Sequence, residues 1–535
     1  MINWLAILLC STISVVLLWC FALPLGISGE WVWQRTGIEP DAAWNLLGGA
    51  IAASLYIGYV VFCRSRFEQP ASSTKRTWEI TASLLGLVVL AFGWLWSVQE
   101  ISPVESRLGK AAFVLYYPSS SGYFTRARYD QPNASELLAT YEGLMGQGDV
   151  LHTGTHPPGL FLVFHGLIAF CSEHPVISSL MDSTQPLSFL EACDVIAKNS
   201  LRLRKPTVVL PLDRQVIWLA TLLVMWSASL TIIPLFLLLR RTCTLPVAWT
   251  GAALWPAMPA VAIFVPKSDV VFPLIAVTVL WLWITAWDRR SLLIGMLSGL
   301  IAWCGLICSL AFLPVFLATG LLTLGTDLAR KWFDTKVDSG GNVVNERTAA
   351  IGIRHWLCIA AAGFGFAIPT IALGCFAHVN LLNVWWMNYR NHANFYHEYS
   401  RTYWKWLLLN PIELSFSAGW PIAMMALIAC CHVIRRAKSR SGTTPSASSI
   451  SIVSTIVFVW GLLWLTGKNS GEAARLWIIF LPWLIWLTGI ELSEHESVVS
   501  DSRLRQRQIL VLLIAQFIVC MLTVTRVSGF HFDGG

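Results

Sequence analysis

Charged residues are scarce in this chain, in which Asp, Glu, Lys and Arg together make up 13% of 535 residues. Soluble domains carry about 25% charged residues, and the mean hydropathy here is +0.62. These values exclude a soluble globular protein. The net charge of +7 is modest, and the sequence has no basic tail and no basic repeat. Nothing in it therefore indicates a nucleic-acid partner.

The thirteen cysteines include no CxxC pair, and most of them lie in apolar runs, where cysteine serves as a small hydrophobic residue. We therefore expect no metal site built on thiolates and predict no cofactor, while a role for a divalent metal stays open. Cys171 and Cys193 share a polar segment and could form a disulfide, although two cysteines in one loop give weak support for one. No positively charged segment precedes the first apolar run, so we interpret it as a retained helix rather than a cleaved signal peptide.

Long apolar runs are abundant, and a helix needs roughly 20 such residues to cross a bilayer. The 28 tryptophans fit a chain with many membrane–water interfaces. The candidate spans are 4–25, 43–63, 78–98, 214–239, 246–265, 269–287, 291–305, 307–325, 354–378, 412–433, 449–466, 474–491 and 508–526. The sequence thus predicts an all-α polytopic membrane protein with about 13 transmembrane helices. The apolar segment 159–171 is too short to cross comfortably and is interpreted as re-entrant or strongly tilted.

Short loops dense in Lys and Arg mark the cytoplasmic side of a membrane protein. Six such loops occur, around residues 64–76, 240–241, 289–290, 330–331, 435–440 and 503–507. All six fall on one side if the N-terminus is cytoplasmic and 159–171 does not cross. We therefore predict a multi-pass protein of the inner or plasma membrane with its active face outward. Three regions follow: three helices in 1–98, an outward loop with amphipathic or juxtamembrane helices in 99–213, and about ten spans in 214–535.

Unusual polar residues gather in five clusters, and the predicted topology places all five on the outward face. The clusters are 28–33, 123–160, 266–269, 385–406 and 467–477. Their coincidence on one side indicates a site there. The transmembrane segments are nearly free of charge, which favours chemistry at the surface over a path through the membrane.

The second cluster ends in the run Leu151–Leu160, which holds two histidines, two glycines and Pro157-Pro158 at the foot of an apolar segment. A polar, constrained turn at a membrane boundary is costly unless it lines a cavity or site. His156 precedes a proline, so its backbone is extended and its ring has a defined direction. His152 and His156 are four apart but separated by Gly154, which argues against a helical metal pair. A capping or interfacial role is the alternative for either histidine.

The first three clusters also contain charged candidates. Glu30, between a glycine and two tryptophans, is expected to be partly desolvated, which would raise its pKa and suit a general base; an interfacial belt with an incidental Glu is the alternative. Arg126 and Arg128, flanked by tyrosines, could hold a phosphate or lie on a solvated amphipathic helix. Lys267 could reach an anionic group, and Asp269 is expected to cap the helix that follows.

The last two clusters mix cations with aromatic residues. Arg390 and His392 lie among Trp, Tyr and Asn, a mixture that suits a carbohydrate-phosphate ligand and also a plain interfacial loop. Arg475 enters an apolar run and must face a partner or an anionic ligand. Glu472 lies three residues earlier, within helical pairing distance, so a structural Glu–Arg pair and a phosphate contact are both open.

Taken in order, these residues resemble the GT-C superfamily of polyprenyl-phosphate-sugar glycosyltransferases, in its protein O-mannosyltransferase-like and aminoarabinose-transferase-like branches. His156-Pro157-Pro158-Gly159 looks like the HPPL element of that family. Pro256 or Pro259 followed by Ser268-Asp269 resembles its proline-then-aspartate helix pair, and 410–421 and 471–475 are similar to its late outward loops. The resemblance covers roughly 120–490. The chain departs from the pattern where the family has an acidic pair after the first helix: a helical hairpin at about 43–98 intervenes, and 121–127 has no carboxylate.

The resemblance implies transfer of a sugar from a polyprenyl-phosphate or diphosphate donor to an acceptor on the outward face. Membrane lipid and this donor are the expected partners, and the acceptor is not indicated. Glu30 or Asp149 would deprotonate the acceptor hydroxyl, with Asp130 as a rival, and Arg126, Lys267 and Arg475 would bind the leaving phosphate. Three alternatives remain open: a transporter or flippase for a lipid-linked or small anionic substrate, a non-catalytic GT-C-like assembly subunit, and a polymerase or ligase of lipid-linked glycans.

Overall fold

The computed structural model describes the whole chain except residues 1, 3, 22–24, 71, 149, 151–153, 203–208, 334–335, 338–342, 345–351, 439–445, 469 and 531–535. Two predicted site residues, Asp149 and His152, lie outside the described residues.

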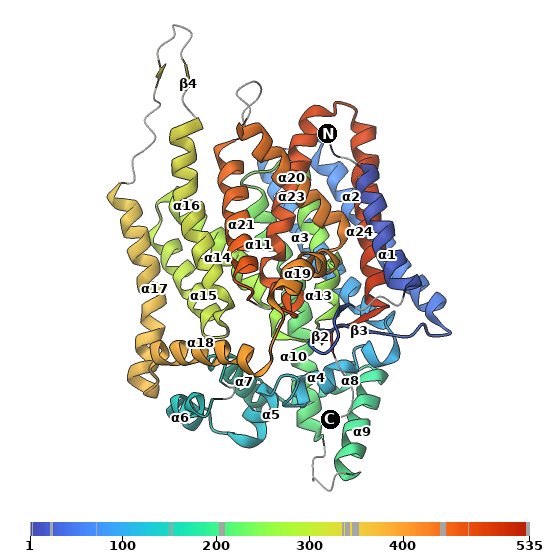
Figure 1. Ribbon diagram of the computed structural model, residues 1–535, viewed down its shortest axis with the longest axis vertical. Helices are drawn as coiled ribbons and strands as arrows, with labels where there is room; N and C mark the ends of the chain where they lie inside the picture. Colours follow the sequence, from blue (N-terminus) through green and yellow to red (C-terminus); the bar gives the residue numbers. More distant parts are fainter. Residues whose placement is uncertain are drawn as a thin grey trace.

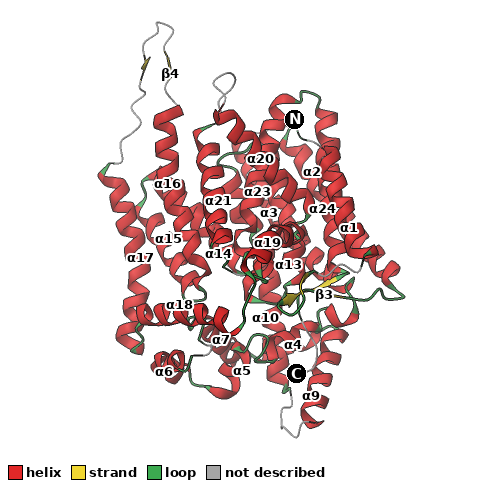
Figure 2. Ribbon diagram, viewed as in Figure 1, coloured by secondary structure: helices red, strands yellow, loops and turns green. Residues whose placement is uncertain are grey.

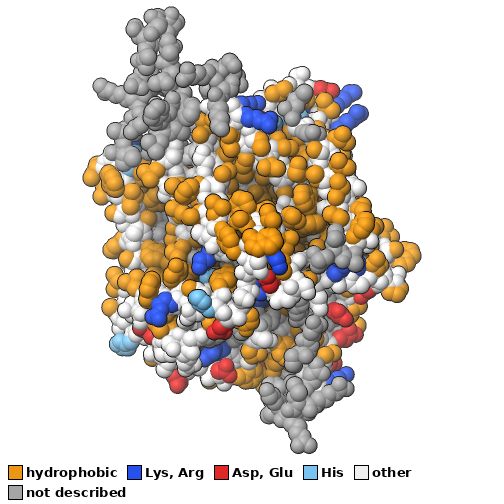
Figure 3. Space-filling model, viewed as in Figure 1, with side chains coloured by type: hydrophobic (Ala, Val, Ile, Leu, Met, Phe, Trp, Pro, Cys, Tyr) orange, Lys and Arg blue, Asp and Glu red, His pale blue; other side chains and the backbone are white. Residues whose placement is uncertain are grey.

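The chain is an all-α polytopic membrane protein (Figures 1 and 2). Within the described residues, eight helical segments are long and apolar enough to cross a membrane, or nine if one bent pair counts as a span. The eight are α2 (Ala42–Phe67), α3 (Ser73–Glu100), α10 (Pro211–Leu230) with α11 (Ile232–Leu239), η4 (Ser268–Val270) with α14 (Phe272–Arg289), α17 (Ile353–Ala377), α20 (Trp420–Lys438), α21 (Ala447–Leu465) and α24 (Ser502–Val524). Figure 3 shows a broad band of hydrophobic side chains around these helices.

The predicted number of about thirteen spans is not confirmed, because several of the apolar runs form short or broken helices. The short apolar helices are α1 (Trp4–Cys20), α15 (Leu292–Leu306) and the segment Leu310–Thr326, which comprises η5 (Leu310–Phe312) and the first part of α16 (Leu313–Phe333). The run 246–265 is broken into α12 (Leu245–Leu254), η3 (Trp255–Ala257) and α13 (Pro259–Ile263). Pro256 and Pro259 lack the backbone N–H that a continuous helix needs.

Two further predicted spans begin later in the chain than expected. The run 412–433 is divided at Gly419, whose φ of +84° ends α19 (Tyr403–Ala418) before α20 begins. The run 474–491 contains α22 (Ala473–Leu476), η6 (Ile478–Phe480) and then α23 (Leu481–Val498). Both breaks place polar residues in non-spanning segments at the ends of helices.

A layer of short helices covers one end of the bundle (Figure 1). It comprises η1 (Val104–Ser106), α4 (Lys110–Tyr116), α5 (Tyr123–Thr125), η2 (Arg126–Asp130), α6 (Ala134–Gly146), α7 (Gly159–Glu173), α8 (Pro175–Thr184), α9 (Leu187–Arg202) and α18 (Leu381–Glu398). Helices α7 and α8 are bent by 102° at His174, which is the geometry of a broken span or a re-entrant loop. The short predicted segment 159–171 is thus the first arm of a bent pair. Cys171 and Cys193, in α7 and α9, are both free and buried.

Three two-stranded antiparallel ladders complete the fold. β1 (Gly26–Ile27) pairs with β2 (Trp31–Val32), and β4 (Lys336–Val337) pairs with β5 (Val343–Val344). β3 (Gln34–Arg35) pairs with β6 (Val527–Ser528), so the loop after the first helix is joined to the end of the last one. This pairing fixes the loop that carries Glu30 against the helix bundle.

Tryptophans also hold the broken helices together inside the bundle. Trp94, Trp249 and Trp255 are fully buried. Their indole N–H groups donate to the backbone oxygens of Pro256 at 2.9 Å, Val60 at 2.9 Å and Ala228 at 2.8 Å respectively. A buried carbonyl without a partner is costly, so these indoles are structural and do not form an interfacial belt.

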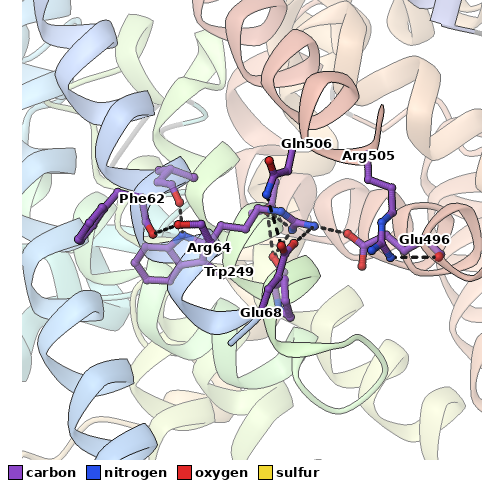
Figure 4. Close-up of polar contacts among 11 residues, drawn as sticks. Phe62, Arg64, Glu68, Trp249, Glu496, Arg505 and Gln506 are labelled. Carbon is purple, nitrogen blue, oxygen red and sulfur yellow. Dashed lines mark hydrogen bonds and ion pairs between the residues drawn. The ribbon is translucent and has the colours of Figure 1, made fainter. Parts of the chain in front are cut away.

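Charged residues at the opposite end join three helix ends (Figure 4). Arg64 is 3% exposed, donates to the backbone oxygen of Pro246 at 2.7 Å and to Thr250 Oγ1 at 2.8 Å, and forms an ion pair with Glu496. Arg505 Nη1 donates to the backbone oxygen of Glu496 at 3.4 Å. Two basic loops that are far apart in the sequence, around Arg64 and Arg505, therefore meet at one end of the molecule.

Candidate functional site

Glu30 lies in the turn between β1 and β2, where its N–H donates to the backbone oxygen of Ile27 at 3.0 Å. Its carboxylate accepts three hydrogen bonds. Thr402 donates from its backbone N–H at 2.9 Å and from its hydroxyl at 2.5 Å, and Trp406 Nε1 donates at 2.7 Å. Because these donors lie at the start of α19, Glu30 links the loop after the first helix to the segment between α18 and α19.

The pKa of Glu30 is lowered rather than raised. Burial alone would raise the pKa of this carboxyl, but the hydrogen bonds from Thr402 and Trp406, with the positive charge of Lys405, together outweigh burial. The expectation of a raised pKa is therefore wrong, because the fold supplies donors that the sequence does not reveal. The carboxylate is held ionised and is a weaker base than predicted.

Residues from all five polar clusters line one cavity of about 530 Å³. The predicted site residues among them are Glu30, His156, Lys267, His392, Glu472 and Arg475. They come from segments separated by up to several hundred residues, so the clustering inferred from topology alone corresponds to a real concave site. The cavity is large enough for a small organic ligand.

Lys267 is the most deeply buried cation of the cavity, with 7% of its surface exposed. Its Nζ donates to the backbone oxygen of Ser120. Burial, and after it the neighbouring charge of Arg475, lowers the pKa of Lys267 to about 7. A lysine that is only partly charged at neutral pH gains much from an anion, because the anion restores the charged form.

Arg475 lies between two carboxylates at the edge of the cavity. Its Nη2 donates to Glu472 Oε2 at 2.7 Å, and its Nε lies 3.9 Å from Asp269 Oδ2. Burial would lower the pKa of Arg475, but the charges of Glu472 and Asp269 outweigh it and raise that pKa. Of the two alternatives that the sequence left open for these residues, the Glu–Arg pair is present. Asp269 faces Arg475, and the N-cap position of α14 is Val271, so the expectation that Asp269 caps this helix is wrong.

The turn before α7 presents Thr155 and His156 to the cavity. The Thr155 hydroxyl lies 3.0 Å from His156 Nδ1, and the edge of the His156 ring contacts Tyr123, with the two ring centroids 5.7 Å apart. Two contacts on one ring give it a defined orientation. His156 is thus positioned as the Pro-Pro sequence predicted, at the boundary between the helix layer and the cavity.

Two asparagines of α18 hold this turn in place. Asn388 Nδ2 donates to the backbone oxygens of Gly154 at 2.8 Å and His156 at 3.2 Å, and Asn391 Nδ2 donates to Gly154 at 3.0 Å. Both asparagines are buried. The two asparagines of the cluster 385–406 therefore stabilise the turn in the cluster 123–160. This role explains why amide side chains occur on a helix otherwise rich in aromatic residues.

The aromatic wall of the cavity is formed by Phe395 and Tyr396 of the same helix and by Tyr399 directly after it. Lys468 Nζ lies 5.8 Å from the ring centre of Tyr396, a cation–π arrangement. His392 also lines the cavity, and burial followed by the charge of Lys468 lowers its pKa. Its imidazole is consequently neutral near pH 7 and able both to donate and to accept a hydrogen bond.

Three predicted cations do not line this cavity. Arg128 Nε donates to the buried carboxylate of Asp213 at 2.9 Å, so it joins the layer of short helices to the start of α10. Arg390 is exposed on α18, and Arg126 is half-buried. The structure therefore separates these three arginines from the six predicted site residues that line the cavity.

Sequence reasoning assigned no role to Glu413, which is 9% exposed and lies beside the cavity on α19. It lines a small void of about 10 Å³ together with Trp31, Glu472 and Arg475, which also line the large cavity. Glu413 lies in the run 412–433, which the sequence predicted to be membrane-spanning. A carboxylate inside such a run, two residues after Pro411, was the signal that could have marked Glu413 as a site residue. Within the described residues, no three His, Cys, Asp or Glu side chains are placed to hold a metal ion.

An apolar groove of about 480 Å³ lies next to the polar cavity. Its walls come from α19, α20, α21 and α23, with residues such as Leu414, Leu427 and Trp460. The two features meet at consecutive residues, since Leu476 lines the cavity and Trp477 lines the groove. The polar cavity and the apolar groove are thus lined by neighbouring residues at the end of α22.

Comparisons with known proteins identify no family for this chain. No family model matches the chain, and no curated protein matches it. Among solved structures, the chain is similar to an oligosaccharyltransferase of Archaeoglobus fulgidus tethered with an acceptor peptide containing the NVT sequon, at a TM-score of 0.40 and 11% identity. The match covers 65% of this chain and 47% of that one, so the chain spans about half the length of that protein. No residue of the cavity is assigned from this likeness.

Proposed function

We propose that the chain is a membrane glycosyltransferase that moves a sugar from a polyprenyl-phosphate or diphosphate donor to an acceptor at the outward face. The observation that carries the proposal is the cavity, in which cations, carboxylates and an aromatic wall adjoin an apolar groove. A lipid-linked sugar phosphate has these same parts: an anionic phosphate, a sugar ring and a long apolar chain. The sequence resemblance to GT-C glycosyltransferases implies the same chemistry.

The phosphate would lie between Lys267 and Arg475. Both side chains line the cavity, and Lys267 is largely desolvated. When the bond between the sugar and the phosphate oxygen breaks, negative charge develops on that oxygen. Cations fixed in place before the reaction stabilise such charge without reorganising, which is often the largest part of catalysis.

The sugar would pack against Phe395, Tyr396 and Tyr399, because pyranose rings present apolar faces that stack on aromatic side chains. The imidazoles of His156 and His392 can hydrogen bond to sugar hydroxyls from the same lining. The apolar chain of the donor would leave the site past Leu476 and Trp477 and occupy the groove between α20 and α21. Both helices are candidate spans, so the groove is accessible to lipid.

The test is transfer by the purified full-length protein in nanodiscs, with a panel of polyprenyl-phosphate sugars carrying a radiolabel in the sugar. We expect one donor to transfer its label, and Arg475→Gln to weaken donor binding by about ten- to a hundredfold, since hydrogen bonds to charged groups contribute about 1.5–3 kcal/mol. Arg354→Gln, an exposed arginine at the start of α17, is the matched control.

In cells, deletion of the gene should remove one defined glycan, and wild type and Arg354→Gln should restore it while Arg475→Gln does not. The proposal is wrong if no glycan changes on deletion and no donor loses its sugar. Movement of an intact donor across the bilayer by the purified protein, without cleavage, would instead favour the transporter alternative.

A further inference from the structure

Glu413 is a buried carboxyl with one occupied and one open oxygen. Its Oε1 accepts hydrogen bonds from Trp33 Nε1 at 3.1 Å and from the backbone N–H of Ala474 at 3.1 Å. Its Oε2 is buried and has no hydrogen-bond partner among the described residues. A buried carboxylate oxygen without a donor costs free energy unless a water, a proton or a ligand satisfies it.

The small void of about 10 Å³ lies next to Glu413, and this is about the space that one water molecule needs. Trp31, Glu472 and Arg475 line both this void and the large cavity. Arg475 Nε is another buried polar atom without a hydrogen-bond partner among the described residues. The void therefore holds both an unsatisfied acceptor and an unsatisfied donor, which makes it suited to a bridging water.

The other carboxylates of the site are already engaged. Glu30 accepts three hydrogen bonds, Glu472 is paired with Arg475 at 2.7 Å, and Asp269 faces the same guanidinium at 3.9 Å. The hydrogen bonds to Glu30 lower its pKa, whereas burial raises the pKa of Asp269 although Arg475 and Lys267 act against it. Of these described carboxyls at the cavity, Glu413 alone has a buried oxygen without a hydrogen-bond partner.

We propose that Glu413 accepts the proton that the acceptor hydroxyl loses during sugar transfer, through a water held in the small void. The inference rests on the proposed glycosyltransferase function. The acceptor oxygen forms a bond to the anomeric carbon of the sugar, and the bond from that carbon to the phosphate oxygen breaks. The electron pair of the broken bond stays on the phosphate. The hydroxyl proton passes to the water, which gives one of its own protons to Glu413 Oε2.

The electrostatic surroundings agree with this role. Burial raises the pKa of Glu413 to about 7, and the hydrogen bonds from Ala474 and Trp33 only partly offset this. The charged groups that face it are Glu472 and Arg475, both on the α22 side; Trp31, Trp33 and Phe264 on the other sides carry no charge. A base whose pKa lies near the working pH combines availability with affinity for the proton.

The experiment uses Glu413→Gln, Glu413→Asp and the control Glu136→Gln in the purified full-length protein. Gln keeps an oxygen for the bonds from Trp33 and Ala474 but takes no proton, so folding is preserved. Glu136 is an exposed glutamate on α6 and does not line the cavity. Two quantities are measured across neutral pH: the infrared band of a protonated buried carboxyl, and the pH profile of kcat for sugar transfer.

We expect wild type and Glu136→Gln to lose a component of the infrared band as pH rises through about 7, the pKa of Glu413, and Glu413→Gln to lack the component that titrates there. Glu413→Gln should lower kcat by about 10²–10⁴-fold while donor KM changes little, which is the usual range for general base catalysis. Glu413→Asp should recover part of the rate.

Each other outcome contradicts either the role of Glu413 or the proposed function. An active wild type with an equally active Glu413→Gln overturns the inference and leaves the proposed function standing. An unchanged infrared band in Glu413→Gln likewise overturns it. A wild type inactive with every donor overturns the function itself, and the role of Glu413 with it.

Discussion

The carboxylate of Glu30 accepts a hydrogen bond from the backbone N–H of Thr402 at 2.9 Å, across a sequence separation of 372 residues. The sequence context of Glu30 predicted a general base with a raised pKa. The carboxylate is instead ionised and accepts hydrogen bonds from several donors. Its main contribution is to hold the loop after the first helix on α19. Two consequences can be measured.

Glu30→Gln should lower stability by about 1–3 kcal/mol at neutral pH, because the amide nitrogen faces N–H donors that then lose their acceptor. The lowered pKa of Glu30 means that its contribution is present above the pKa of the unfolded chain and is lost as pH falls through the folded value. Thermal unfolding in detergent should therefore show a steeper loss of Tm on acidification for wild type than for Glu30→Gln. Parallel curves would contradict the assignment.

Anion binding at the cavity should weaken as pH rises, because Lys267 has a pKa of about 7. Between about pH 6 and pH 8 its charged fraction falls from roughly nine-tenths to one-tenth, so affinity for a polyprenyl phosphodiester should fall by up to about tenfold. The phosphodiester keeps its own charge over this range. Tryptophan fluorescence titrations would give the dissociation constants.

Two variants separate Lys267 from other titrating groups in this experiment. Lys267→Gln should bind weakly with a flat pH profile, while Glu413→Gln should keep the dependence. Lys75→Gln is the control, since Lys75 is exposed at the start of α3. A flat profile in wild type would exclude Lys267 as a phosphate contact.

The sequence predicted the fold class and the meeting of the polar clusters because both follow from composition and charge order along the chain. Apolar runs locate helices, and Lys and Arg in short loops locate one side of the membrane. Those two rules predict that Glu30, His156 and Arg475 lie on the same side of the membrane, although no contact between them was known. All three line the same cavity, which the rules do not specify.

The breaks in the helices and the hydrogen-bond partners of the site residues could not be predicted from the sequence, because they depend on contacts between residues that are distant in sequence. Glu413 accepts from Trp33 across 380 residues, so its burial and its raised pKa arise only after folding. The helix end at Gly419 interrupts an apolar run that composition alone reads as continuous. Arg128, for which the sequence left a phosphate contact and a solvated helix open, is instead paired with Asp213.

The buried ion pair between Arg64 and Glu496 should be a strong contributor to stability at the end opposite the cavity. Arg64 and Glu496 are 3% and 12% exposed in their side chains. Arg64→Met should destabilise the protein by about 3–5 kcal/mol, because Glu496 loses its cation in a buried place. Arg66→Met is the matched control two residues later, since Arg66 is 49% exposed and its bond to Glu79 at 3.3 Å contributes about 0–1 kcal/mol. Equal losses of Tm in the two variants would contradict the role of burial.

Gly159 should be irreplaceable in the turn that presents His156 to the cavity. Its N–H donates to the backbone oxygen of Ile307 at 2.8 Å, and an added Cβ would lie 2.6 Å from that same oxygen. Gly159→Ala should therefore cost about 1–3 kcal/mol through overpacking and lower sugar transfer, because the turn moves away from α15. Gly166→Ala lies in the same helix with nothing within 4 Å of the added carbon, so it should stabilise α7 by about 0.5–1 kcal/mol. Thermal unfolding of the two variants gives opposite shifts if the close approach to Ile307 positions this turn, and shifts of the same sign exclude it.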